Sequence, residues 1–167
     1  MLIFDSSTLI LIAKVELLDV FLKDIGMEIV IPKGVEDECC GGKKTLDALI
    51  IRKAVHESRI KVKSVRNRKL VAKLGEDFSM GSGESEAIAL ALQEKALLVG
   101  IDDKNGINAC KLVGISFTTA VGILVRSCQK GLIDRSDGLV KLSALGEYGR
   151  YRNAILEDAK LRIEEQP

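Results

Sequence analysis

Acidic side chains follow two short aliphatic runs of the chain. Asp5 comes directly after the run at 2–4, and the pair Asp102 and Asp103 comes directly after the run at 97–101. In an open parallel α/β sheet, ligands bind at the carboxyl ends of the strands. If both runs are strands of one sheet, we expect these three acids to face a common site.

Two further acids fall on predicted helices. Glu38 lies three residues after Val35 on a short helix, so part of its helix face is apolar. Glu84 lies four residues before Ile88, which places its carboxylate on the apolar stripe of another helix. Glu86 aligns with a more polar face of the same helix. We therefore expect Glu38 and Glu84, rather than Glu86, to join the acids at the strand ends.

Grouped carboxylates call for a counter-charge. They repel one another, and their burial without compensation would raise several of their pKa values. A divalent cation supplies that compensation. The chain has one histidine, His56, and no CxxC pair, so the ligands would be oxygens alone. Such ligands select Mg²⁺ or Mn²⁺, and these sites commonly act on phosphoryl groups by activating water and stabilising the leaving oxygen.

Each acid also has a purely structural interpretation. Asp5 with Ser6 or Ser7 could cap the helix that follows, and the acid pair after the second run could cap another helix. Glu84 and Glu86 are favourable in any first helical turn. For a single acid the structural interpretation is favoured. Together they indicate a site, because they fall at strand ends and at an inward helix position at once.

The composition is that of one globular domain. The chain has 167 residues, 47% hydrophobic and 29% charged, which excludes disorder and coiled coil. Aromatic residues make up 4% and Trp is absent, which argues against a stacking platform for bases. No apolar run approaches the length of a membrane span, and Asp5 interrupts the N-terminus where a signal peptide would still be apolar. We expect a cytoplasmic protein without a membrane partner.

The order of patterns predicts an α/β fold with a parallel sheet, because short aliphatic runs alternate with helical periodicity. Strands are expected at 2–4, 28–31, 60–65, 97–101 and 115–118. Helices are expected at 8–13, 16–25, 32–40, 43–58, 66–74, 84–95, 104–112 and 119–130, with two more up to 165. The cysteines are expected to be reduced core or near-surface residues, and His56 is expected to face solvent.

A basic stretch lies between residues 52 and 73, where nine Lys and Arg accompany the single acid Glu57 in a chain of net charge +1. Such a patch would favour a phosphate backbone, with Arg66, Arg68 and Lys69 as candidate RNA contacts. A solvated face, or a surface that docks an acidic partner, is an equal alternative.

Four blocks of the sequence, in order, resemble the PIN domain family of metal-dependent nucleases, which includes the VapC toxins of prokaryotic VapBC toxin–antitoxin pairs. The blocks are LIFDSSTLI at 2–10, IVIPKGVEDE at 29–38, GSGESEAIALAL at 81–92 and LLVGIDDK at 97–104. The Gly-Glu-x-Glu-Ala-Ile form resembles a prokaryotic subgroup. The resemblance implies a three-layer α/β/α sandwich with a central parallel sheet and an acidic pocket for Mg²⁺ or Mn²⁺. It covers about residues 1–130 of one domain at 1–167, which leaves 131–167 as an extra C-terminal helical extension.

The resemblance also implies roles for single residues. Asp5, Glu38 and Glu84 match the first three acids of the family pattern. The last acid is Asp102 or Asp103, and Asp103 is favoured because Asp-Lys resembles the Asp-Arg of the family. Supporting hydroxyls would be Ser6 near the first acid and Thr118 or Thr119 after the last strand, with Thr119 preferred. The stretch at 105–108 departs from the pattern, because it lacks an Arg that relatives carry there.

The function expected from this resemblance is a metal-dependent endoribonuclease that acts on single-stranded or structured RNA. It would be the toxin of a toxin–antitoxin pair, with a small antitoxin protein as partner, and a homodimer. The alternative is a PIN-like RNA-binding or protein-interaction module that cleaves nothing. An aspartyl-phosphate phosphatase is disfavoured, because Ser7 stands where that class needs a second Asp.

Overall fold

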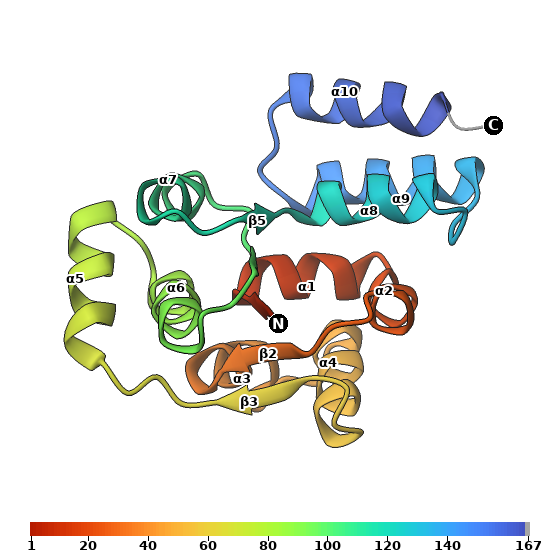
Figure 1. The fold of residues 1–167 in the computed structure, drawn as a ribbon. Helices are drawn as coiled ribbons and strands as arrows, with labels where there is room; N and C mark the ends of the chain where they lie inside the picture. The colour runs from red at the N-terminus through yellow and green to blue at the C-terminus, as the bar shows by residue number, and fades with distance from the viewer. Residues whose placement is uncertain (166–167) are drawn as a thin grey trace.

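A five-stranded, all-parallel sheet forms the centre of the protein in the computed structural model, which describes residues 1–165 (Figure 1). The strand order is β3-β2-β1-β4-β5. The strands are β1 (Leu2–Phe4), β2 (Ile29–Pro32), β3 (Lys61–Lys63), β4 (Leu98–Gly100) and β5 (Phe117–Thr118). The α/β fold with a parallel sheet, predicted from the alternation of patterns, is confirmed.

Ten helices flank this sheet in the described part of the chain. They are α1 (Ser6–Lys14), α2 (Leu18–Asp24), α3 (Lys33–Cys40), α4 (Leu46–His56), α5 (Arg68–Phe78), α6 (Ser82–Glu94), α7 (Lys104–Val113), α8 (Ala120–Gln129), α9 (Arg135–Tyr148) and α10 (Asn153–Glu164). They join the sheet in a three-layer sandwich, as expected.

Two cores lie on the two faces of the sheet, because successive strand side chains point to opposite sides. Leu2 and Phe4 of β1 face a core shared with α1, α2, α4 and α8. Ile3, between them, faces a second core shared with α5, α6 and α7. All three β1 side chains are fully buried, so the first strand anchors both layers.

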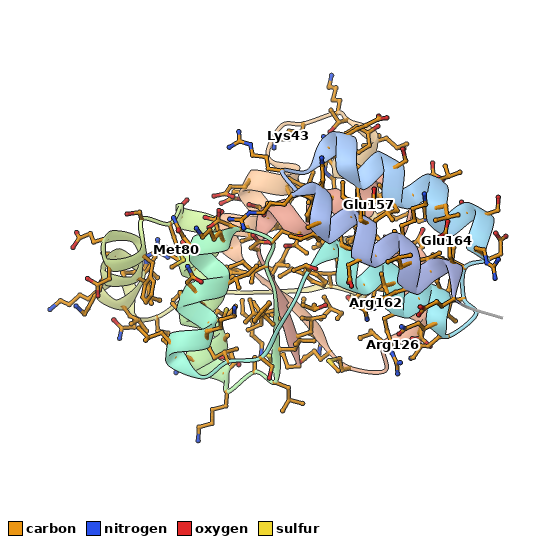
Figure 2. The ribbon with its side chains drawn as sticks, turned by 90° about the horizontal axis from the view of Figure 1, so that it is seen from above. Lys43, Met80, Arg126, Glu157, Arg162 and Glu164 are labelled. Atoms are coloured by element: carbon orange, nitrogen blue, oxygen red, sulfur yellow. The ribbon has the colours of Figure 1, made fainter. Side chains whose placement is uncertain are left out.

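The last three helices form a stack on one side of the sandwich. Figure 1 shows α10 outermost, above α8 and α9, and Figure 2 looks down on this helix, along which Glu157, Arg162 and Glu164 are exposed. Ala159 and Ile163 point inward and join the core beneath. Within residues 1–165, none of the helices combines the length and the apolar character that a membrane crossing requires.

Some helix boundaries differ from the predicted ones for local reasons. The first helix begins at Ser6, two residues before the predicted start, because Asp5 has extended backbone and caps the helix by accepting from the Thr8 amide. Helix α5 continues to Phe78 and ends at Ser79, whose φ of 53° breaks the helical path. As predicted, the four cysteines are free and buried, and His56 is exposed at the end of α4.

Candidate metal centre

Asp5 occupies the most protected acidic position of the protein. It directly follows β1, and its side chain is fully buried. Its carboxylate accepts hydrogen bonds from the Ser7 hydroxyl at 2.6 Å and from the Thr8 amide at 2.8 Å. Burial raises the pKa of Asp5 to about 7 against the opposing effect of these bonds, and the charge of Asp102 adds to the rise. Asp5 is therefore both a helix cap and a carboxylate poised near neutral pH.

Asp102 is the acid that the fold brings next to Asp5. Strand β1 pairs with β4, with Phe4 opposite Gly100, so Asp5 and Asp102 leave neighbouring strands at the same edge. This is the point where the strand order reverses, which is where open α/β sheets bind ligands. One oxygen of Asp102 accepts from the Ala120 amide at 2.9 Å, at the start of α8. Burial raises the pKa of Asp102 as well.

Asp103 lies elsewhere, against the sequence-based preference for it as the last acid of the site. Its side chain is exposed and caps α7, accepting from the amides of Asn105 and Gly106. Two adjacent residues in extended backbone point in opposite directions, so only one of the pair can face Asp5. In this structure that residue is Asp102.

The surroundings of the two carboxylates fit a hydrated divalent cation. The Thr8 hydroxyl is fully buried, lies close enough to lower the pKa of both acids, and is the one buried side-chain polar atom of residues 1–165 without a hydrogen-bond partner. Over the same range, no three His, Cys, Asp or Glu side chains are grouped closely enough to hold an ion by themselves. Mg²⁺ commonly binds through one or two carboxylates and keeps several waters. Asp5 and Asp102 therefore suit Mg²⁺ or Mn²⁺ as a pair.

Glu38 reaches the same region from α3 through two hydroxyl groups. Its two carboxylate oxygens accept from Ser6 at 2.5 Å and from Ser82 at 2.9 Å. Gly83 makes this approach possible, since a Cβ there would lie 2.7 Å from a Glu38 oxygen and 3.0 Å from the Ser6 hydroxyl. Ser6, predicted to assist the acids, donates a hydrogen bond to Glu38. The positive end of the α6 dipole also stabilises the negative charge of this carboxylate.

The two glutamates of α6 have environments opposite to those predicted. Glu86 is 6% exposed, forms an ion pair with Arg68 at 2.5 Å and accepts from the Gly34 amide at 3.1 Å. Glu84 is only half-buried, and its carboxylate folds back over Gly81, the cap of its own helix. The expectation that Glu86 takes the polar face is wrong, because an arginine and a backbone amide compensate its burial.

Thr119 has a capping contact at the edge of the site. Its hydroxyl caps α8 by accepting from the Gly122 amide at 3.0 Å. This cap orients the first turn of α8, whose Ala120 amide binds Asp102. Thr119 therefore affects the site indirectly, by capping the helix whose first residue binds Asp102.

The basic stretch is largely paired with acids from other parts of the chain. Arg68 binds Glu86, and Lys63 binds Glu94 at 2.8 Å. Arg66 lies 3.8 Å from Glu94 and remains mostly exposed, as does Lys69. The charge that the sequence concentrates in this stretch is therefore partly offset in the fold. Contacts of Arg66, Arg68 and Lys69 with RNA stay a prediction.

The fold and site define a class: a three-layer α/β/α protein with paired carboxylates at the switch point of a parallel sheet. A family model described as DUF3368, PIN domain, matches residues 1–163. The chain belongs to the PIN domain family, whose members are typically nucleases that use divalent metals. No curated protein and no solved structure matched the chain.

Two residues of the site were not found from the sequence. Tyr151 donates its hydroxyl to Asp102 at 2.6 Å from the connection between α9 and α10. Its only mark in the sequence is that it is one of two tyrosines. Thr8, expected only as the start of a helix, faces both carboxylates because the helix begins two residues earlier.

Proposed function

We propose that this protein is a Mg²⁺- or Mn²⁺-dependent endoribonuclease whose centre is the pair Asp5 and Asp102. The observation that carries the proposal is the meeting of these two desolvated carboxylates at the switch point of the sheet, with the pKa of Asp5 raised to about 7. A folded chain that places like charges together in a buried pocket is destabilised unless a cation binds there. Membership of a family of nucleases supplies the reaction class.

Different residues around this centre would hold the cation, orient its ligands and attract the phosphodiester. A bound divalent cation would activate water and stabilise the leaving oxygen. Asp5 and Asp102 would hold that cation, each with its orientation fixed by donors at the start of a helix, Thr8 of α1 and Ala120 of α8. Glu38 holds the Ser6 and Ser82 hydroxyls in place beside them. The positive ends of α1, α6 and α8 also favour the negative charge of a phosphodiester.

RNA as substrate is supported by basic groups next to Glu38. Lys43 and Lys44 are exposed in the loop after α3, and the Lys43 ammonium donates to the Glu38 carbonyl. Arg52 holds this loop by donating to the carbonyls of Cys40 and Lys43, at 2.7 and 2.9 Å. Cations beside an acidic centre suit a phosphate backbone that must approach it.

One observation favours the alternative of a binding module without activity. The described acids do not form a cluster of three or more at ion-binding distance; Glu84 folds back over Gly81 and Asp103 caps α7 instead. A role as the toxin of a toxin–antitoxin pair, a small antitoxin partner and a homodimer stay predictions. A small reading frame beside the gene would support the toxin role.

The test is cleavage of a fluorescently labelled single-stranded RNA in Mn²⁺, in Mg²⁺ and in EDTA. We expect cutting with either metal and none in EDTA, and we expect Asp5→Asn and Asp102→Asn each to abolish it. Asp103→Asn is the matched control, because Asn caps a helix as well as Asp does and cleavage should persist. Equal cutting by wild type and Asp5→Asn would indicate a contaminating nuclease and refute the mechanism. RNA binding without metal-dependent cutting would favour the non-catalytic alternative.

A further inference from the structure

The connection between α9 and α10 delivers a tyrosine into the acidic centre. Figure 1 shows this connection passing the end of β5, where α8 begins. Tyr151 lies in it, partly buried, with its hydroxyl 2.6 Å from one oxygen of Asp102. The other oxygen of Asp102 accepts from Ala120. Two donors from separate elements thus bind the two oxygens of one carboxylate.

The ring of Tyr151 packs into space left by the missing side chain of Gly149. A Cβ at Gly149 would lie 2.3 Å and 2.8 Å from two ring carbons of Tyr151, closer than real contacts allow. The φ of Gly149 is −99°, a value that any residue adopts, so glycine is needed here for space rather than for conformation. The missing side chain at Gly149 therefore lets the ring pack against the backbone.

We propose that Tyr151 is a positioning residue that orients Asp102 as a metal ligand. This inference rests on the proposed metal centre. A carboxylate oxygen has two lone pairs, so the hydrogen bond from Tyr151 leaves each oxygen of Asp102 able to take a further partner. Donors behind a ligating carboxylate fix its direction, and their loss commonly lowers metal affinity by about 10- to 100-fold. The α9–α10 unit thereby contributes to a site otherwise built at the ends of β1 and β4.

The nearby Tyr148 provides a matched control. It lies three residues earlier, at the end of α9, and is 54% exposed with its ring under the Lys14 ammonium at 5.0 Å. It has no part in the contact to Asp102. Removal of its hydroxyl changes the same chemical group in the same part of the chain without touching the site.

The experiment measures Mn²⁺ affinity of the full chain from the electron paramagnetic resonance signal of free Mn²⁺. We expect Tyr151→Phe to raise the Kd by about tenfold or more, and Tyr148→Phe to leave it unchanged. Gly149→Ala keeps the Tyr151 hydroxyl but displaces its ring, so it should raise the Kd in the same direction. A merely structural role would lower the melting temperature of Tyr151→Phe and leave its Kd as in the wild type, which would overturn the proposal.

Tyrosine fluorescence gives a second readout that does not depend on cleavage. The chain has no Trp and two tyrosines, so in Tyr148→Phe all the emission comes from Tyr151. Mg²⁺ should change this emission with a saturating dependence, while in Tyr151→Phe the emission of Tyr148 should not respond. An unresponsive Tyr151 signal would overturn the proposal. If wild type binds Mn²⁺ and Tyr151→Phe binds it equally, this inference alone fails, whereas absence of binding to wild type refutes the metal centre as well.

Discussion

Replacement of Asp5 by Asn should make the metal-free protein more stable at neutral pH but not at acid pH. The pKa of Asp5 is raised from 3.8 to about 7 by its burial, so the folded state holds this proton over a range in which the unfolded chain has released it. Between those two values the folded state binds more protons, and stability falls as pH rises. The stabilisation of the folded state by the proton on Asp5 is complete below pH 3.8 and is lost above pH 7.

The magnitude follows from the size of the shift. Each pH unit between the two pKa values costs about 1.4 kcal/mol, which amounts to about 4 kcal/mol in total and about 2–3 kcal/mol between pH 5 and pH 7. The titratable groups that interact electrostatically with Asp5 are Asp102, Cys39, Cys110 and Tyr151. The pKa values of the two thiols and the phenol are raised by burial, so these three stay neutral in this range. Asp102 is the one neighbour whose charge adds to the effect.

The pH dependence of this stability difference is measured by urea unfolding in EDTA, followed by circular dichroism at several pH values from 5 to 8. The difference in unfolding free energy between Asp5→Asn and wild type should grow in favour of the variant as pH rises and level off above pH 7. Asn preserves the helix cap, so at pH 5 the variant should exceed the wild type only by the roughly 1.6 kcal/mol that the wild type has lost between pH 3.8 and pH 5. A difference that stays constant with pH would refute the assignment of a raised pKa to Asp5.

Two further predictions concern the contacts around the site. Arg68→Ala should lower the unfolding free energy by about 1–2 kcal/mol because it leaves the buried Glu86 without its cation, whereas the exposed neighbour Lys69→Ala should change it by less than about 0.5 kcal/mol in the same urea assay. Equal effects of the two would show that the ion pair contributes nothing. Gly83→Ala should leave the melting temperature unchanged or higher, since Ala favours a helix by about 1 kcal/mol, but should reduce RNA cleavage about tenfold or more, because its Cβ displaces Glu38 or Ser6. Unchanged cleavage would show that the Glu38–Ser6 contact is not needed.

The order of the elements was predictable because it depends on local patterns. The run Leu97–Ile101 is aliphatic except for Gly100, as expected for a strand covered on both faces, and β4 lies within it. Asp5 could be placed at the edge of the sheet for the same reason, since it directly follows such a run. Family resemblance then pointed to Glu38, whose contact with Ser6 connects α3 to α1.

Periodicity could not predict which of the two α6 glutamates is buried. This helix lies between the sheet and α3, α5 and α7, and is buried continuously from Ser85 to Ala91. A helix buried nearly all round has no polar face by which to orient its residues. Arg68 and Gly34, which make burial of Glu86 tolerable, come from other elements. The choice between Asp102 and Asp103 could not be made from the sequence either, since adjacent residues of an extended chain point to opposite sides and the pattern does not say which side faces Asp5.

The position of β1 at the middle of the sheet has a consequence for how the protein reaches its native state. Strands β1, β2 and β3 are neighbours in sequence order and can pair early, whereas β1 meets β4 through Phe4 and Gly100, which are far apart in the chain. Pairings between distant segments form slowly because a long loop must close first. A half-assembled sheet would contain Asp5 but not Asp102. Metal affinity should therefore appear only in the last phase of refolding, so partly folded chains would lack the site.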